Sequence, residues 1–309
     1  MLDFIKKTFS EFSEDRCTTL GAALAYYTIF SLPPLLFILV TVMSWGLSAT
    51  TSGDGAEQRA QEAIQQQVSG MLGNESATSV IQTILENRKN DQGSWWKTLI
   101  SVVGILIGAT GVVAAIQDSL NRVWGVKPDP KTGGGWWSIV VKRLLSLSMI
   151  LGLGFILLVS LMLTAVLTTL GERALSTIGI TAGVGQIVNY AVQFLVVVVV
   201  FGAIFKFMPD AVIRWRDILV GAVVTAVLFM VGQFALHWYL ASSDPGQQLG
   251  SAAGSVAVVL IWVYYSALIF LLGAEITQVY AQRFGKGVQP EPNAVHFEET
   301  IKRRGEATA

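Results

Sequence analysis

The chain has 309 residues, of which 52% are hydrophobic and 14% are charged, and its 21 Lys and Arg balance its 21 Asp and Glu. Soluble globular chains carry about 25% charged residues, so this composition excludes an ordinary water-soluble domain. It predicts an integral membrane protein whose main partner is the lipid bilayer. Zero net charge also excludes the strong positive field with which proteins attract nucleic acids.

The first predicted element is an amphipathic helix over residues 1–16. Leu2, Ile5, Phe9 and Phe12 recur at helical spacing, and polar residues that include Lys6, Lys7, Ser10 and Glu14 lie elsewhere on the helix. A helix of this kind lies in the membrane interface with its apolar face in the lipid. We therefore expect a cytoplasmic interfacial helix, for which simple anchoring is a sufficient role.

Six apolar stretches follow within a predicted transmembrane domain of residues 17–283. They cover residues 18–46, 98–117, 141–169, 185–207, 217–240 and 252–279. Each reaches the length of about 20 residues that crosses about 30 Å of hydrocarbon. Barrel strands are shorter and alternate, and backbone groups in lipid must be hydrogen-bonded within their own segment. The pattern therefore predicts an all-α polytopic protein with a bundle of six transmembrane helices.

Two prolines interrupt the first span. Pro33 and Pro34 remove two backbone donors, which leaves the carbonyls four residues earlier without their usual helical partners. Broken helices at this depth hold substrate or ion sites in transporters. Tyr27, Ser31 and the two prolines are therefore candidate pathway residues, although a simple kink satisfied by Ser31 and its neighbours accounts for the same pattern.

Two segments outside the spans have distinct compositions. The loop over residues 47–97 has its own helical periodicity around a Gly73-Asn74 break, which predicts an extracytoplasmic helical hairpin. The tail over residues 284–309 has no apolar period, and we expect it to be disordered.

The distribution of Lys and Arg predicts the orientation. One set of loops and ends holds 16 of these residues, and the alternate set holds 5. Because basic residues concentrate on the cytoplasmic side, we expect both termini to be cytoplasmic. An even number of spans puts both termini on the same side of the membrane, which agrees with this assignment.

Polar side chains also occur within the fourth and fifth spans. Gln193 lies in one of them, and Gln233 and His237 follow each other at a spacing of four residues in the other. They form a candidate outer polar cluster that lines a cavity or, as is common in membrane bundles, hydrogen-bonds between helices.

Glu275 is the most informative single residue because it is a carboxylate inside the sixth span. An ionisable group in hydrocarbon normally faces the bundle interior and has a partner or a proton. Tyr264, eleven residues earlier, lies on the same helix face and joins Glu275 as a candidate pathway residue. The alternative is a buried ion pair with Lys206, Arg143 or Arg16 that fixes helix packing.

Signatures of catalysis are missing from the sequence. Its two histidines, His237 and His296, lie in a span and in the tail, so no metal cluster is predicted. The sequence has no phosphate-binding loop, no nucleophile elbow and no dinucleotide-binding fingerprint. We therefore expect no enzymatic activity, no metal and no cofactor.

Several motifs resemble the YihY/BrkB family of bacterial inner-membrane proteins. They are Leu20 to Pro34, Asn121 with Trp124, Met208-Pro209, Trp215 with Asp217 and Gly221-Ala222, and Trp262 to Ala267 running on to Gly273-Ala274-Glu275. The resemblance implies six spans, a multi-pass inner-membrane location and an association with serum resistance or virulence in some members. Members often carry the label ribonuclease BN, which the missing metal cluster and basic groove disfavour.

The leading functional hypothesis is a transporter or exporter of a small solute or ion, linked to envelope integrity. It predicts a water-accessible pathway joining Tyr27, Ser31, Tyr264 and Glu275. The alternative is a noncatalytic membrane scaffold for envelope assembly, which predicts that the same residues are tightly packed. The substrate, the coupling ion, the direction of transport and the oligomeric state, a homo-oligomer included, stay open at this point.

Overall fold

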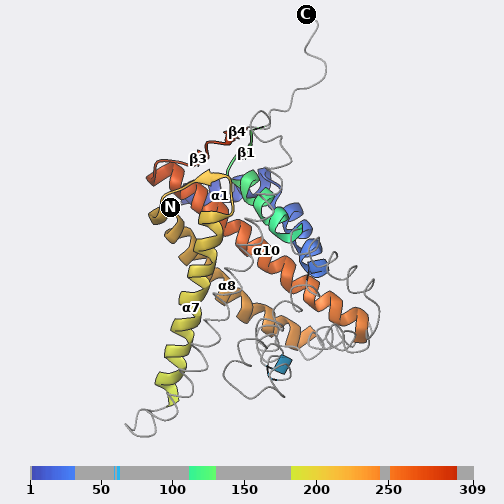
Figure 1. Cartoon of the computed structure of the whole chain (residues 1–309). Helices are drawn as coiled ribbons and strands as arrows, with labels where there is room; N and C mark the ends of the chain where they lie inside the picture. Colours follow the sequence, from blue (N-terminus) through green and yellow to red (C-terminus); the bar gives the residue numbers. More distant parts are fainter. Residues whose placement is uncertain are drawn as a thin grey trace, which may run out of the picture.

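The computed structural model describes residues 2–31, 59, 61–62, 111–129, 182–243 and 251–297 (Figure 1). This part of the chain is mostly helical. Its helices are α1 (Leu2–Glu14), α7 (Ala182–Phe207), α8 (Trp215–Ser243) and α10 (Ser251–Phe284), and residues 17–31 and 111–123 are also helical. Its strands are β1 (Val126–Pro128), β2 (Ala211–Val212), β3 (Gln289–Pro290) and β4 (Ala294–His296).

Three of the described helices are long and apolar enough to cross a bilayer. The candidate spans are Tyr190–Phe207 in α7, Trp215–Leu236 in α8 and Val256–Phe284 in α10, and they overlap the last three predicted spans. The first two predicted spans are helical over residues 18–31 and 111–117. The rest of those two spans, the third span and nearly all of the predicted hairpin over 47–97 lie outside the described residues.

The two helices α8 and α10 run antiparallel and approach each other at two glycines. A Cβ atom on Gly221 would overlap the side chain of Thr277, and one on Gly273 would overlap that of Thr225. Each threonine hydroxyl donates to a carbonyl of its own helix, Thr225 Oγ1 to Gly221 O and Thr277 Oγ1 to Gly273 O, both at 2.7 Å. Each threonine is thus satisfied locally while it fills the space above the opposite glycine. We call these four residues the Gly–Thr lock.

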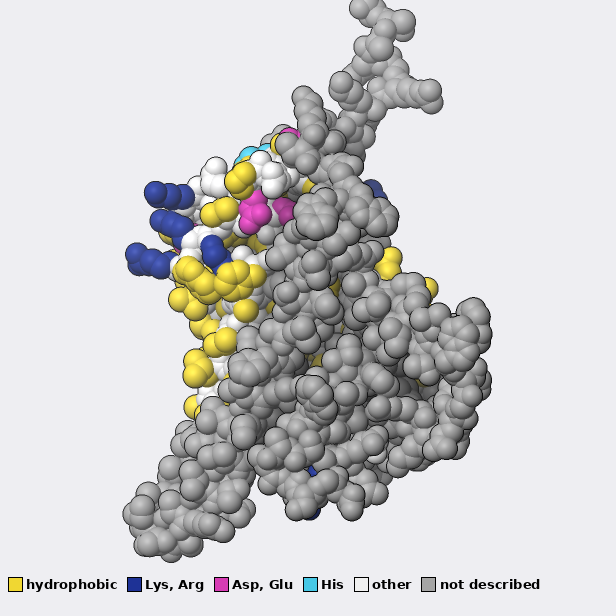
Figure 2. All heavy atoms as spheres, viewed as in Figure 1, with side chains coloured by type: hydrophobic (Ala, Val, Ile, Leu, Met, Phe, Trp, Pro, Cys, Tyr) yellow, Lys and Arg dark blue, Asp and Glu magenta, His cyan; other side chains and the backbone are white. Residues whose placement is uncertain are grey.

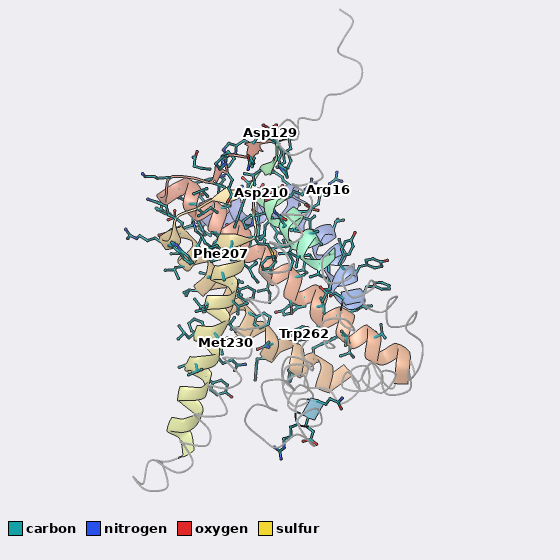
Figure 3. All side chains as sticks on the ribbon, viewed as in Figure 1. Arg16, Asp129, Phe207, Asp210, Met230 and Trp262 are labelled. Carbon is teal, nitrogen blue, oxygen red and sulfur yellow. The ribbon has the colours of Figure 1, made fainter. Side chains whose placement is uncertain are left out.

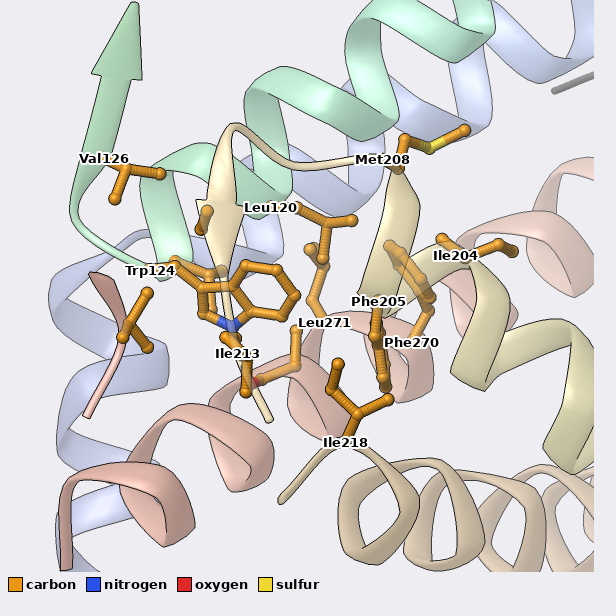
Figure 4. Packing of buried hydrophobic residues seen from close by; sticks show 14 of the residues in the cluster. Leu120, Trp124, Val126, Ile204, Phe205, Met208, Ile213, Ile218, Phe270 and Leu271 are labelled. Carbon is orange, nitrogen blue, oxygen red and sulfur yellow. The ribbon is translucent and has the colours of Figure 1, made fainter. Parts of the chain in front are cut away.

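A hydrophobic core fills the end of the bundle where α7 ends and α8 begins (Figure 4). Trp124 packs edge-on against Phe205, with ring centroids 6.2 Å apart, and Phe205 packs against Phe270 at 5.4 Å. The Trp124 indole Nε1 also donates to the Ala274 carbonyl at 3.2 Å. The indole therefore joins the end of the 111–123 helix to α10.

Four short strands close this end of the molecule, and we call β1 to β4 together the strand collar. β1 pairs antiparallel with β4, and β2 pairs antiparallel with β3. The segment after α10 thus bridges both to the turn that follows residues 111–123 and to the turn between α7 and α8 (Figure 1).

The strand collar changes the interpretation of the C-terminal tail. The sequence predicts disorder over residues 284–309, whereas residues 285–297 are ordered and supply β3 and β4. Pairing of such short strands relies on backbone hydrogen bonds and leaves no apolar period for sequence analysis to detect. Residues 298–309 lie outside the described part of the chain.

Asn121 and Asp210 attach the strand collar to the helices. Asn121 Nδ2 donates to Asp210 Oδ2, and the Asp210 backbone N–H donates to Asn121 Oδ1, each at 2.8 Å. Gln117 Nε2 donates to the other carboxylate oxygen of Asp210 at 3.2 Å. Asp210 lies at the same end of the molecule as Asp129 and Arg16 (Figure 3).

The N-terminal helix α1 packs against α10 at this same end (Figure 1). Leu2 and Phe9 are 74% and 59% exposed, so most of the apolar stripe seen in the sequence faces outward, while Thr8 is buried and Phe12 packs against the hydrophobic core. Arg16, with a φ of 53°, forms the turn between α1 and the helix of residues 17–31. The outward stripe is in the position that a helix lying in the membrane interface requires.

Gly221→Ala is expected to destabilise the protein by about 1 to 3 kcal/mol, since an added methyl group at a filled contact forces the two helices apart. Gly202→Ala on α7 is the matched control, because its Cβ would meet the Ala222 Cβ at an ordinary 3.8 Å. Thermal unfolding of the purified proteins in detergent measures the difference. Equal melting temperatures for the two variants would show that the Gly–Thr lock does not contribute to the stability of the bundle.

Candidate functional site

Glu275 lies in the α10 span with none of its side chain exposed. Cys17 Sγ, from the start of the 17–31 helix, donates to Glu275 Oε1 at 3.4 Å. The other oxygen, Oε2, is buried and has no hydrogen-bond partner among the described residues. A buried carboxylate oxygen without a donor or a cation is costly, and the described residues supply neither to Oε2.

The strongest charges that act on Glu275 are also acidic. They belong to Asp15, in the turn after α1, and to Glu11 on α1. Two carboxylates that lie close together in a partly buried site repel, and one bound proton removes the repulsion. The ion-pair alternative from the sequence gives Glu275 a basic partner, whereas the described structure brings the acidic Asp15 to it.

Asp15 is half-buried, and this burial raises the pKa of its carboxyl to about 6. The nearby Arg122 opposes the shift, while Glu11 and Glu14 add to it. Arg122 also holds the turn in place, because its Nε donates to the Asp15 carbonyl at 3.1 Å. The Asp15 carboxyl therefore keeps its proton up to a higher pH than an ordinary aspartate does.

A second buried acceptor lies one turn further along α10. Gln278 is 8% exposed, and its Oε1 atom, like Glu275 Oε2, has no hydrogen-bond partner in the described part of the chain. Residues three apart are neighbours on a helix surface. Two adjacent turns of α10 thus each carry a buried acceptor atom that lacks a donor among the described residues.

The predicted partners of Glu275 have other contacts. Lys206 Nζ donates to the Ile213 carbonyl at 2.7 Å and lies over the Trp215 ring at 5.8 Å. Arg16 is exposed, and Arg143 lies outside the described residues. Within the described residues Glu275 therefore forms no ion pair with Lys206 or Arg16, because Lys206 serves the α7–α8 turn and Arg16 points to the surface.

The other predicted pathway residues lie apart from Glu275. Tyr27 is 45% exposed and lies beside Gly111, and Ser31 is buried with its hydroxyl donating to the Thr28 carbonyl at 2.8 Å. Tyr264 packs in an apolar cluster around Val258, Val259 and Val263.

Pro33 and Pro34 lie outside the described residues, and so does the break that they predict. In the predicted outer cluster, Gln193 on α7 and Gln233 on α8 are both half-buried. The backbone of His237 is part of α8, and its side chain lies outside the described part of the structure.

Sequence reasoning identified Glu275 but not the groups around it. Asp15 and Cys17 precede the first apolar stretch, and nothing in their local pattern points to a residue about 260 positions away. Gln278 could have been identified from the sequence, since it is a second polar residue one turn from Glu275 in the same predicted span.

Comparison with known proteins gives the family of this chain. A family model described as virulence factor BrkB matches residues 8–297. A Bacillus subtilis protein named as ribonuclease-like, YfkH, is 23% identical over 285 residues, covering 91% of this chain and 96% of its own length. A UPF0761 membrane protein of Aeromonas salmonicida is 25% identical over 285 residues, covering 89% of this chain and 87% of its own. No solved structure matches significantly.

Some of the residues that carry the family resemblance lie at the strand collar or in the helices next to it. Asn121 binds Asp210, and Trp124 binds the carbonyl next to Glu275. Gly221 belongs to the Gly–Thr lock, and the matched region ends at residue 297, just after β4. The resemblance seen in the sequence is confirmed: this chain is a membrane protein of the BrkB virulence factor family.

Proposed function

We propose that the protein transports a small solute or ion across the bacterial inner membrane and that the Asp15–Glu275 carboxyl pair is its proton-binding site. Its transmembrane domain is a bundle of six helices, and its transport activity supports envelope integrity and serum resistance. The observation that carries the proposal is the buried Glu275 Oε2 atom, which has no donor among the described residues and lies within a membrane span.

A bound proton satisfies this site without any further partner. Protonation turns Oε2 into a hydroxyl that donates, and it removes the repulsion between Glu275 and Asp15. Arg122, beside Asp15, offsets the negative charge that remains on the pair. Loss of the proton adds a charge in a low-dielectric region, so release favours a rearrangement or the entry of a cationic or hydrogen-bonding solute.

Access to the pair is from the end that carries the strand collar. Asp15 lies half-buried at the surface of this end, and Glu275 lies behind it. The excess of Lys and Arg supports a cytoplasmic location for the same end. The pair is therefore placed to exchange protons with the cytoplasm and to pass them towards the bundle.

Glu275→Gln is expected to abolish proton-coupled flux while abundance and melting temperature stay at the wild-type level or rise. The amide keeps the volume, and no cation among the described residues loses its partner. Flux is measured in proteoliposomes against a panel of metabolites and ions, with a pH gradient imposed and then removed. Glu291→Gln, an exposed acid between β3 and β4, is the control and should leave flux unchanged.

Two outcomes would contradict this proposal. A large drop in the stability of Glu275→Gln would mean that the carboxylate is paired with a cation beyond the described residues. Wild-type protein that moves no solute or proton in this assay, with an intact fold and correct insertion, would favour the noncatalytic scaffold for envelope assembly.

Asp15→Asn is expected to raise stability relative to the wild type in a pH-dependent manner. The folded protein binds the Asp15 proton more tightly than the unfolded chain, so the free energy of unfolding of the wild type falls as pH rises from about 4 to 6. The difference in melting temperature between variant and wild type should grow over this window and level off above it. A difference that is constant with pH would show that Asp15 titrates normally.

The topology is tested with cysteine probes after Cys17→Ser, which keeps a donor to Glu275. Lys286→Cys, at an exposed position after α10, should react with a membrane-impermeant thiol reagent only when the cells are opened. Gly70→Cys, in the loop between the first two predicted spans, should react in intact cells. The reverse pattern would invert the proposed orientation.

A further inference from the structure

A pocket of about 390 Å³ opens between α1 and the C-terminal end of α10. Its walls combine apolar, cationic, acidic and amide side chains, namely Asp3, Phe4, Lys7, Val279, Gln282 and Arg283. Lys7 Nζ donates to Gln282 Oε1 at 3.1 Å, which holds the ammonium group at the α10 side. An ammonium group has three donors, so two of them are left for a ligand.

The pocket lies at the end of an apolar span, which is where the head groups of a bilayer are expected. Arg283 is the last residue but one of the apolar span Val256–Phe284. The exposed apolar side chains Leu2, Ile5 and Phe9 on α1 mark the boundary with the hydrocarbon. Figure 2 shows Lys and Arg side chains gathered at one end of the molecule, next to a hydrophobic surface.

The charge of the pocket favours an anion. Lys7 and Arg283 supply two positive charges against the single acid Asp3. Arg283 forms a fork of donors that matches phosphate oxygens, while Lys7 acts as a point charge beside it. Phe4 and Val279 supply an apolar wall that a fully water-soluble anion would not use.

We propose that this pocket binds the head group of an anionic phospholipid, with the phosphate between Lys7 and Arg283. The start of the acyl chains lies against Phe4 and Val279, and head-group hydroxyls donate to Asp3. The bound lipid then joins α1 to α10 one to two turns beyond Glu275, in addition to the direct packing of the two helices. This site is independent of the proposed transport activity.

The test measures binding of phosphatidylglycerol to the purified full-length protein in detergent, by native mass spectrometry and by thermal stabilisation. Lys7→Gln and Arg283→Gln should each weaken binding about fivefold, and the double variant more. Lys6→Gln, an exposed neighbour on α1 outside the pocket, should bind as the wild type does. Unchanged melting temperatures without added lipid establish that the variants are folded.

Further arms identify the ligand. Phosphatidylcholine should bind more weakly than phosphatidylglycerol, and glycerol 3-phosphate should not compete at equal concentration. Lys7→Arg keeps the positive charge and should retain binding. If Arg283→Gln does not fold, the comparison of Lys7→Arg with Lys7→Gln tests the role of the charge. Equal loss of binding in Lys6→Gln, equal binding of phosphatidylcholine, or full competition by glycerol 3-phosphate would each overturn the proposal.

Discussion

The close approach of α8 and α10 in the Gly–Thr lock determines how the end that carries the strand collar is built. The same pattern, Gly-Ala-x-x-Thr, occurs at residues 221–225 and 273–277, and both alanines are fully buried. Because the helices are antiparallel, each glycine receives the threonine of the other. Glu275 lies midway between Gly273 and Thr277, about 200° around the helix from each. The face that packs on α8 therefore directs Glu275 to the opposite side, where Cys17 meets it.

Two buried acids at this end illustrate two ways of satisfying a carboxylate. Asp217, 3% exposed in the first turn of α8, accepts from Arg214 Nε at 3.0 Å and benefits from the positive end of the helix dipole. Glu275 has neither, since it lies within a long helix and its strongest charged neighbours are acidic. The arrangement at Asp217 is that of a structural ion pair. The arrangement at Glu275 is unfavourable when both carboxyls are charged. A bound proton removes the repulsion between Glu275 and Asp15.

The sequence was sufficient for features that depend on local pattern. The long apolar runs predicted the last three spans, and the position of Glu275 in one of them predicted that it is buried. Features that depend on distant contacts could not be predicted in this way. Lys206 was a reasonable partner for Glu275 by charge, but a free carbonyl at Ile213, seven residues away, is its actual acceptor. The order of residues 285–297 likewise depends on loops that lie far away in the sequence.

The strand collar also joins helices that are far apart in the sequence at one end of the described structure. β2 and β3 tie the α7–α8 turn to the segment after α10, and β1 and β4 tie that segment to the end of the 111–123 helix. At the other end α7 diverges from α10 (Figure 1). Because these helices are joined at one end, a small change in the angle between them at that end gives a displacement that grows with distance along the helices. The Asp15–Glu275 carboxyl pair lies close to the joined end. A small local rearrangement at the pair therefore gives a large displacement at the far ends of the helices.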